Sequence, residues 1–156
     1  MLHRRQNTGY QDGKWDIAGS GRVDKGETPQ HAVARECEEE LGIGVKIEDL
    51  SFAHLSFHQS SDRTYYDIYF IVHRYEGSPS IMEPDKCSAL EWFDIDKLPK
   101  GIIECRRQVI NSYRNSHYYS ETFDYTEWQR ELYKDIPLEE FLNDATAFRR
   151  RHDKAE

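Results

Sequence analysis

Apolar side chains recur with helical spacing between residues 29 and 41. Four residues that share one helical face form this stripe: Val33, Ala34, Cys37 and Leu41. Thr28 is a favourable N-cap, Pro29 suits the first helical position, and Gly42 suits the residue just beyond the last turn. The pattern therefore predicts a helix over 29–41 that packs one face against a core.

Other apolar stretches predict strands and a second helix. Strands are predicted over 1–5, 15–18, 51–58, 64–74 and 90–94, and the segment 64–74 is rich in Tyr, Ile, Phe and Val. The polar residues 60–62 mark a hairpin turn between two of these strands. Trp92 and Phe93 are expected on opposite faces of the last strand. A helical pattern over 102–113 is expected to bury Ile102, Ile103, Val109 and Ile110.

Glutamates crowd the polar face of the first predicted helix, at Glu36, Glu38, Glu39 and Glu40. Three of them, Glu36, Glu39 and Glu40, lie at i, i+3 and i+4, so their carboxylates are expected to converge. The preceding residues 19–26 are rich in glycine and predict a loop whose backbone can approach a ligand or ion closely. Two interpretations arise from the residues alone. The face is either solvated, as charge runs usually are, or it binds Mg²⁺ or Mn²⁺ together with substrate phosphates.

The wider spacing around these glutamates favours the metal site. Gly21 is followed after five residues by Glu27, and after seven more by Arg35 and the segment 36–43. This order resembles the Nudix box, G-x5-E-x7-R-E-U-x-E-E-x-G-U, in which U is an apolar residue. Every fixed letter matches, and Cys37 and Ile43 fill the apolar positions. A motif of this length is highly specific.

The segments on either side of the box extend the resemblance. Residues 4–15 and 83–99 are similar to the flanks of the box in MutT-like Nudix proteins, so the resemblance covers roughly residues 1–115. It implies the Nudix fold, a mixed β-sheet sandwiched between α-helices in an α/β/α arrangement. It also implies hydrolysis of a nucleoside diphosphate linked to another group.

The resemblance implies roles for individual residues as well. The implied metal site consists of Glu36, Glu39, Glu40 and the backbone of Gly21. The implied catalytic set consists of Glu36, Glu39, Arg35 and Glu27. Arg35 and Glu27 would pair and hold the loop against the helix. A metal would neutralise charge on the phosphates, and a glutamate such as Glu36 could act on the attacking water. Glu38 would remain a solvated bystander.

Candidate substrate contacts lie outside the box. Arg5 and Tyr10 flank the loop before it, and Glu83 is a candidate for an additional glutamate, although a surface role fits Glu83 equally well. Residues 58–61 lack the proline or tyrosine that ADP-ribose and dinucleoside polyphosphate hydrolases of the family often carry there. We therefore expect a nucleoside triphosphate, cleaved to a monophosphate and pyrophosphate. The alternatives are ADP-ribose, a nucleotide sugar or capped RNA, or a non-catalytic module that senses a nucleotide.

The amino-acid composition restricts the kinds of partner that we expect the protein to bind. The chain of 156 residues carries a net charge of −8, which disfavours broad binding of nucleic acid. Its cysteines, Cys37, Cys87 and Cys105, are odd in number and lack CxxC spacing, so they indicate reduced thiols in the cytoplasm. No apolar run approaches the ~20 residues that span a bilayer. We expect a small-molecule nucleotide as partner and no membrane, and a homodimer remains open.

The two ends of the chain depart from the family pattern. Residues 1–124 are expected to form the Nudix domain and 125–156 a helical C-terminal extension, in which an amphipathic helix begins near Pro137. The first strand is expected to be shortened at Met1, because related chains usually carry further residues before it. Either the natural chain begins upstream, or a neighbouring chain or the extension completes the sheet edge.

Overall fold

The computed structural model describes residues 1–59 and 63–123. The predicted turn at 60–62 and the predicted extension at 125–156 lie outside the described residues. The chain divides into two compact units, of which the first comprises Met1–Phe57 and Tyr65–Thr122. The second comprises His58–Thr64 and Phe123–Glu156. Every candidate site residue lies in the first unit.

A three-stranded sheet in the order β2-β1-β5 contains the N-terminus. Strand β1 (Leu2–Arg5) pairs antiparallel with β2 (Trp15–Ile17) on one side and with β5 (Cys87–Glu91) on the other. Strand β1 is therefore the central strand of this sheet. The shortening of the first strand stays a prediction.

The bounds of the strand predicted over 90–94 are wrong. The observed strand β5 (Cys87–Glu91) begins three residues earlier, because its register is set by pairing with β1. Trp92 and Phe93 come after the strand, so the prediction that they lie on its opposite faces is wrong. Trp92 is largely exposed, whereas Phe93 packs edge-on against Trp15 with ring centroids 4.9 Å apart.

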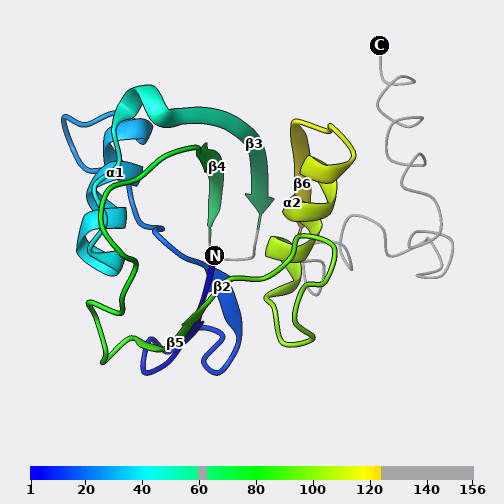
Figure 1. Cartoon of the computed structure of the whole chain (residues 1–156). Coiled ribbons are helices and arrows are strands. Elements are labelled where there is room, and N and C mark those ends of the chain that lie inside the picture. Colours follow the sequence, from blue (N-terminus) through cyan, green and yellow to red (C-terminus); the bar gives the residue numbers. More distant parts are fainter. Residues whose placement is uncertain (60–62, 124–156) are drawn as a thin grey trace, which may run out of the picture. The chain divides into compact units, whose positions relative to one another are not determined.

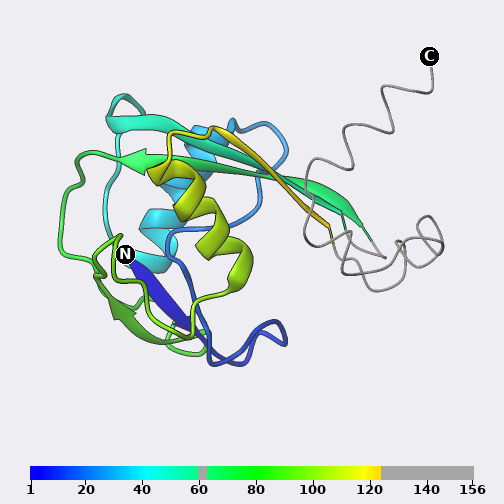
Figure 2. The same ribbon diagram turned by 90° about the vertical axis from the view of Figure 1, so that its right-hand side faces the viewer.

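A second three-stranded sheet has the order β4-β3-β6. Strands β3 (Leu50–Gln59) and β4 (Thr64–Val72) agree with the predicted strands to within two residues. Strand β6 (Tyr119–Phe123) was not predicted from the sequence. Helices α1 (Pro29–Leu41) and α2 (Glu104–Arg114) lie on opposite sides of the strands, as Figures 1 and 2 show from two directions. A 3₁₀ turn, η1 (Ile47–Asp49), precedes β3.

Helix α1 forms where its end signals predict it. Thr28 accepts a hydrogen bond from the His31 backbone, and Pro29 occupies the first turn. At the other end Gly42 adopts the left-handed conformation, with φ of 67°, and its N–H bonds to Glu38 O at 3.0 Å. The buried residues of the helix are Ala32, Cys37 and Leu41.

Helix α2 begins two residues later than predicted. Ile102 and Ile103 are buried as expected, but they precede the helix, and Ile103 O accepts hydrogen bonds from the first helical turn. Val109 is buried within it. None of the described helices combines the length and the apolar character needed to cross a bilayer.

Candidate active site

The guanidinium of Arg35 lies at the centre of the box. It bonds to Glu27 Oε1 at 2.8 Å, to Glu36 Oε1 at 2.7 Å and to Glu39 Oε2 at 3.1 Å. A further bond to Arg22 O at 2.9 Å holds the loop before the helix. Hydrogen bonding to Glu27 is the largest cause that raises the pKa of Arg35, and the same bond lowers the pKa of Glu27. The expected pairing of Arg35 with Glu27 is therefore present.

Gly21 lies directly against the carboxylate of Glu36. A Cβ placed on Gly21 would overlap the Glu36 carboxylate, so only glycine leaves this carboxylate where it is. The φ of Gly21 is not among the positive values, which means that the requirement is one of space and not of backbone conformation. Gly21 therefore lies beside Glu36, one of the carboxylates with which it is predicted to form a metal site.

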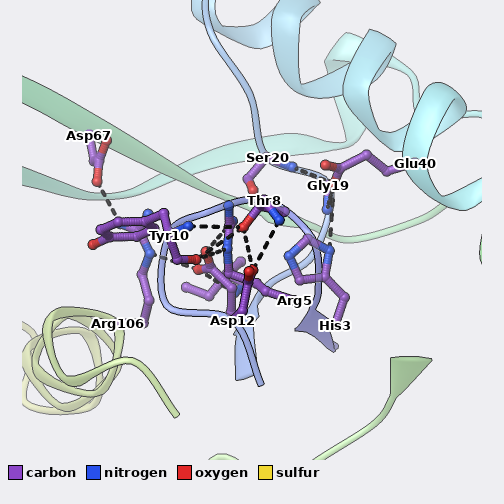
Figure 3. Close-up of polar contacts among 12 residues, drawn as sticks. His3, Arg5, Thr8, Tyr10, Asp12, Gly19, Ser20, Glu40, Asp67 and Arg106 are labelled. Atoms are coloured by element: carbon purple, nitrogen blue, oxygen red, sulfur yellow. Dashed lines mark hydrogen bonds and ion pairs between the residues drawn. The ribbon is translucent and has the colours of Figure 1, made fainter. Parts of the chain in front are cut away.

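Glu40 is held in a different way from Glu36 and Glu39. Its Oε2 accepts the backbone N–H groups of Gly19 at 2.9 Å and Ser20 at 3.0 Å (Figure 3). Burial raises the pKa of Glu40 to about 7, the two backbone hydrogen bonds oppose that shift, and the charges of Glu36 and Glu83 add to it. Of the box glutamates, Glu40 is therefore the one whose surroundings disfavour the charged carboxylate.

The predicted metal ligands do not form a ready-made coordination shell. No group of three or more His, Cys, Asp or Glu side chains within residues 1–59 and 63–123 is arranged to hold an ion. One nitrogen of Arg35, Nη1, contacts both Glu36 and Glu39 and so brings these two carboxylates together. Three carboxylates beside the Gly21 backbone offer the oxygen ligands that hard cations such as Mg²⁺ or Mn²⁺ prefer. For such an ion to bind, Arg35 must release its contacts with Glu36 and Glu39.

A cavity of about 60 Å³ lies beside Glu40, and we call it the Glu40 cavity. It is lined by His3, Arg5, Thr8, Glu40, Leu41, Ile81, Glu83, Lys86, Cys87 and Leu90. The structure thus brings Arg5 and Glu83, two of the predicted substrate contacts, to the same cavity as Glu40. Glu83 bonds to Lys86 at 2.6 Å. Sequence reasoning missed His3 and Lys86, which carry no motif.

Tyr10, the third predicted substrate contact, does not line the Glu40 cavity. It sits on the loop between β1 and β2, where Arg5 Nε donates to Tyr10 O at 2.9 Å and the Arg5 guanidinium lies 5.5 Å from the Tyr10 ring centroid. Asp12 accepts hydrogen bonds from the backbone of Thr8 and Gly9, which ties the loop together. Tyr10 is about two-fifths exposed.

A buried ionic network behind this loop was not predicted. Asp16 is 2% exposed and bonds to Arg5 at 3.0 Å and to Arg106 at 2.8 Å. Arg106 also contacts Asp67 and the hydroxyl of Tyr69. The network joins β1, β2, β4 and α2. The one sequence signal for it is Asp16, a polar residue inside the short apolar strand 15–17.

Comparison with known proteins identifies the family of this chain. The NUDIX domain model matches residues 1–113. The chain belongs to the Nudix family. It is 36% identical over 104 residues to the oxidized purine nucleoside triphosphate hydrolase of Danio rerio, across 64% of this chain and 61% of that relative. It is 33% identical over 101 residues to the 8-oxo-dGTP diphosphatase of Escherichia coli (strain K12), across 64% of this chain and 76% of that one.

The fold of this Nudix chain also matches a solved structure. A MutT NUDIX hydrolase from Burkholderia pseudomallei superposes with a TM-score of 0.63 and 30% identity, over 70% of this chain and 84% of that one. The prediction of a MutT-like Nudix member with an α/β fold is confirmed. The matched region spans 61% of the length of the Danio rerio relative.

Proposed function

We propose that this protein is a metal-dependent Nudix hydrolase that converts a nucleoside triphosphate to a monophosphate and pyrophosphate in the cytoplasm. The observation that carries the proposal is the convergence of Glu36 and Glu39 on Arg35, beside Gly21 and the half-buried Glu40. The names of the Danio rerio and Escherichia coli relatives support a triphosphate substrate.

Three side chains would hold the metal, namely Glu36, Glu39 and Glu40, with the Gly21 backbone beside them. When bound, a Mg²⁺ or Mn²⁺ ion would supply charge neutralisation at the phosphates. Arg35 would hold the loop through Glu27, which fixes the position of Gly21 relative to the helix. The N–H groups of Gly19 and Ser20 orient the carboxylate of Glu40 through its Oε2.

The reaction itself is a hydrolysis. The oxygen of water forms a bond to phosphorus, the bond from that phosphorus to the bridging oxygen breaks, and pyrophosphate leaves with the bridging oxygen. Glu36 is the candidate to accept the proton of the water, since a carboxylate beside the reacting phosphate can act as a general base. Arg5, Tyr10 and Glu83 are the candidate substrate contacts, with Arg5 and Glu83 in the Glu40 cavity.

The test is a phosphate-release assay over nucleoside triphosphates, ADP-ribose, nucleotide sugars and capped RNA, with Mg²⁺ and with a chelator. We expect metal-dependent release of pyrophosphate from a triphosphate. Turnover confined to ADP-ribose, a nucleotide sugar or capped RNA would replace the substrate assignment. Nucleotide binding without any turnover would identify a sensing module instead.

Glu39→Gln tests the metal assignment, with Glu38→Gln as the matched control. The first change removes one ligand charge at nearly constant shape, and Glu38 is an exposed neighbour on the same helix. We expect Glu39→Gln to lower kcat by about 100-fold, the upper range for a disturbed metal site, and Glu38→Gln to leave it unchanged. Equal rates in the two variants would contradict the assignment.

A further inference from the structure

The loop between β1 and β2 has an uncommon backbone conformation. Four alternate residues in it have a positive φ, between 53° and 80°, namely Asn7, Gly9, Gln11 and Gly13. Glycine adopts this left-handed region freely, whereas Asn7 and Gln11 adopt it at a cost in free energy. Other contacts must therefore hold the loop in this conformation.

Asp12 provides such contacts at the tip of the loop. Its Oδ1 accepts hydrogen bonds from the backbone N–H of Thr8 at 3.1 Å and from the Thr8 hydroxyl at 2.7 Å. Its Oδ2 accepts the backbone N–H of Gly9 at 3.2 Å, and Figure 3 shows the Asp12 carboxylate beside Thr8. The hydrogen bond from the Thr8 side chain is the largest cause that lowers the pKa of Asp12, so the loop favours the charged carboxylate.

The two ends of the loop are held by other groups. At one end, Asn7 Nδ2 donates to Asp85 O at 3.1 Å. At the other end, Arg4 Nε donates to Gly13 O at 3.0 Å. We therefore expect loss of the Asp12 carboxylate to release the tip of the loop and to leave β1 and β2 paired.

Hydrogen bonds connect the tip of the loop to Arg5. The Thr8 hydroxyl, which donates to Asp12, accepts the backbone N–H of Tyr10 at 3.3 Å. Tyr10 O accepts a hydrogen bond from Arg5 Nε at 2.9 Å, and Arg5 Nη1 donates to Asp16 at 3.0 Å. Two bonds at different nitrogens fix the orientation of a planar guanidinium. Because Asp16 is buried in the network behind the loop, the bond to Tyr10 is the one that depends on the loop.

We propose that Asp12 is a positioning residue for Arg5. By holding Thr8, its carboxylate fixes the Tyr10 carbonyl and so orients the guanidinium of Arg5, which lines the Glu40 cavity. The proposal rests on the proposed function, because that function assigns Arg5 to the substrate. It adds to the site an exposed residue that lies outside the cavity lining.

The first test compares the kinetics of Asp12→Ala and Asp94→Ala with those of the wild type in Mg²⁺. Asp94 is the matched control, because it is exposed and also accepts a backbone N–H in a turn, that of Asp96 at 2.9 Å. We expect Asp12→Ala to raise KM about tenfold and to keep kcat within about threefold, since the box glutamates are untouched. Asp94→Ala should match the wild type in both. An unchanged KM in Asp12→Ala, or an equal rise in both variants, would overturn the proposal.

The second test determines whether the effect of Asp12 depends on Arg5. Arg5→Lys removes the Nε donor to Tyr10 O. In that background we expect Asp12→Ala to change KM by less than about twofold, because the two changes interrupt the same route. An equal rise of KM in both backgrounds would show that Asp12 does not act through Arg5.

Asp12→Asn separates the hydrogen bonds of Asp12 from its charge. The asparagine keeps an oxygen that can accept both bonds from Thr8, while the negative charge is lost. We expect its KM to lie closer to that of the wild type than to that of Asp12→Ala. A KM equal to that of Asp12→Ala would contradict the route through Thr8.

The third test needs no turnover. Nuclear magnetic resonance measures how fast the Arg5 Nε proton exchanges with solvent in the full chain without substrate. We expect exchange at least about tenfold faster in Asp12→Ala and unchanged in Asp94→Ala, because the bond to Tyr10 O protects this proton. Equal exchange in the wild type and Asp12→Ala would overturn the proposal. Thermal unfolding confirms that each variant is folded.

The exchange measurement keeps this proposal distinguishable from the proposed function. Faster exchange in Asp12→Ala, without hydrolysis of any phosphoanhydride by the wild type, would overturn the proposed function and leave the contact between the loop and Arg5 in place. Hydrolysis with a KM and an exchange rate that do not depend on Asp12 would overturn the positioning role alone.

Discussion

Gly21→Ala offers a perturbation whose size can be worked out from the structure. A methyl group at Gly21 would overlap Glu36 Oε1, and Glu36 Oε2 would lie 2.5 Å away, against 3.4–4 Å for an ordinary contact. The backbone of Gly21 does not require positive φ, so alanine suits its conformation. The carboxylate of Glu36 must therefore withdraw by about 1 Å.

A displacement of about 1 Å in a group that positions the reaction can lower the rate by about 100-fold. We expect that loss in kcat, because the proposed function assigns Glu36 both to the metal and to the attacking water. The unfolding free energy is expected to change by less than about 1 kcal/mol, since the moving group is the end of a side chain whose ion pair with Arg35 is partly exposed.

The assay is metal-dependent hydrolysis of the triphosphate, with urea unfolding measured in parallel. Gly44→Ala is the matched control, because its Cβ would meet only Glu76 Cβ at 3.8 Å and its backbone also lacks positive φ. A kcat for Gly21→Ala within threefold of the wild type would refute the reasoning. An equal loss in Gly44→Ala would refute it as well, because the effect would then not depend on Glu36.

Two further predictions concern the scaffold. Asp16→Asn leaves the charges of Arg5 and Arg106 less well paired in a buried place, and we expect a loss of about 3 kcal/mol in unfolding free energy by urea titration; a loss below about 0.5 kcal/mol would show that the network is not needed for stability. Burial raises the pKa of Cys37 to about 11, so at pH 8 its thiolate fraction is on the order of one in a thousand, against roughly one in four for an unperturbed thiol. Iodoacetamide should modify Cys37 far more slowly in the folded protein than in urea, and equal rates in a peptide-mapping assay would contradict this.

Local signals made part of the fold predictable. Helix α1 is encoded by its cap residues and its apolar stripe, because both depend on neighbours within a few positions. Strand β5 was displaced in the prediction because its ends depend on pairing with β1, more than 80 residues away in the sequence. Strand β6 was missed because residues 119–123 place three consecutive polar residues between Tyr119 and Phe123, so they show neither an apolar run nor an alternating pattern.

The site residues also differ in how far the sequence predicts their contacts. The residues of the box are fixed by spacing on one helix and its preceding loop, so the contacts of Arg35 with Glu27 and Glu39 could be expected from sequence. Asp16 and Arg106 are 90 positions apart, and neither carries a motif. Their pairing depends on how α2 packs beside β2, which no local pattern encodes. The position of His3 in the lining of the Glu40 cavity likewise depends on packing.

The negative charges of the three box carboxylates, Glu36, Glu39 and Glu40, are compensated by different groups. This difference affects where an added cation would bind most favourably. Arg35 already provides a positive charge to Glu36 and Glu39, so a metal ion there must displace contacts of 2.7 and 3.1 Å. Glu40 receives the N–H groups of Gly19 and Ser20, and burial raises its pKa to about 7. A divalent cation would therefore gain the most interaction energy at Glu40, because no side-chain cation among the described residues lies at hydrogen-bond distance from that carboxylate. At Glu36 and Glu39 the gain would be smaller, because Arg35 competes for both carboxylates. If a metal ion replaced Arg35 at Glu36 and Glu39, the guanidinium would keep its contact with Glu27, and the loop would stay in place.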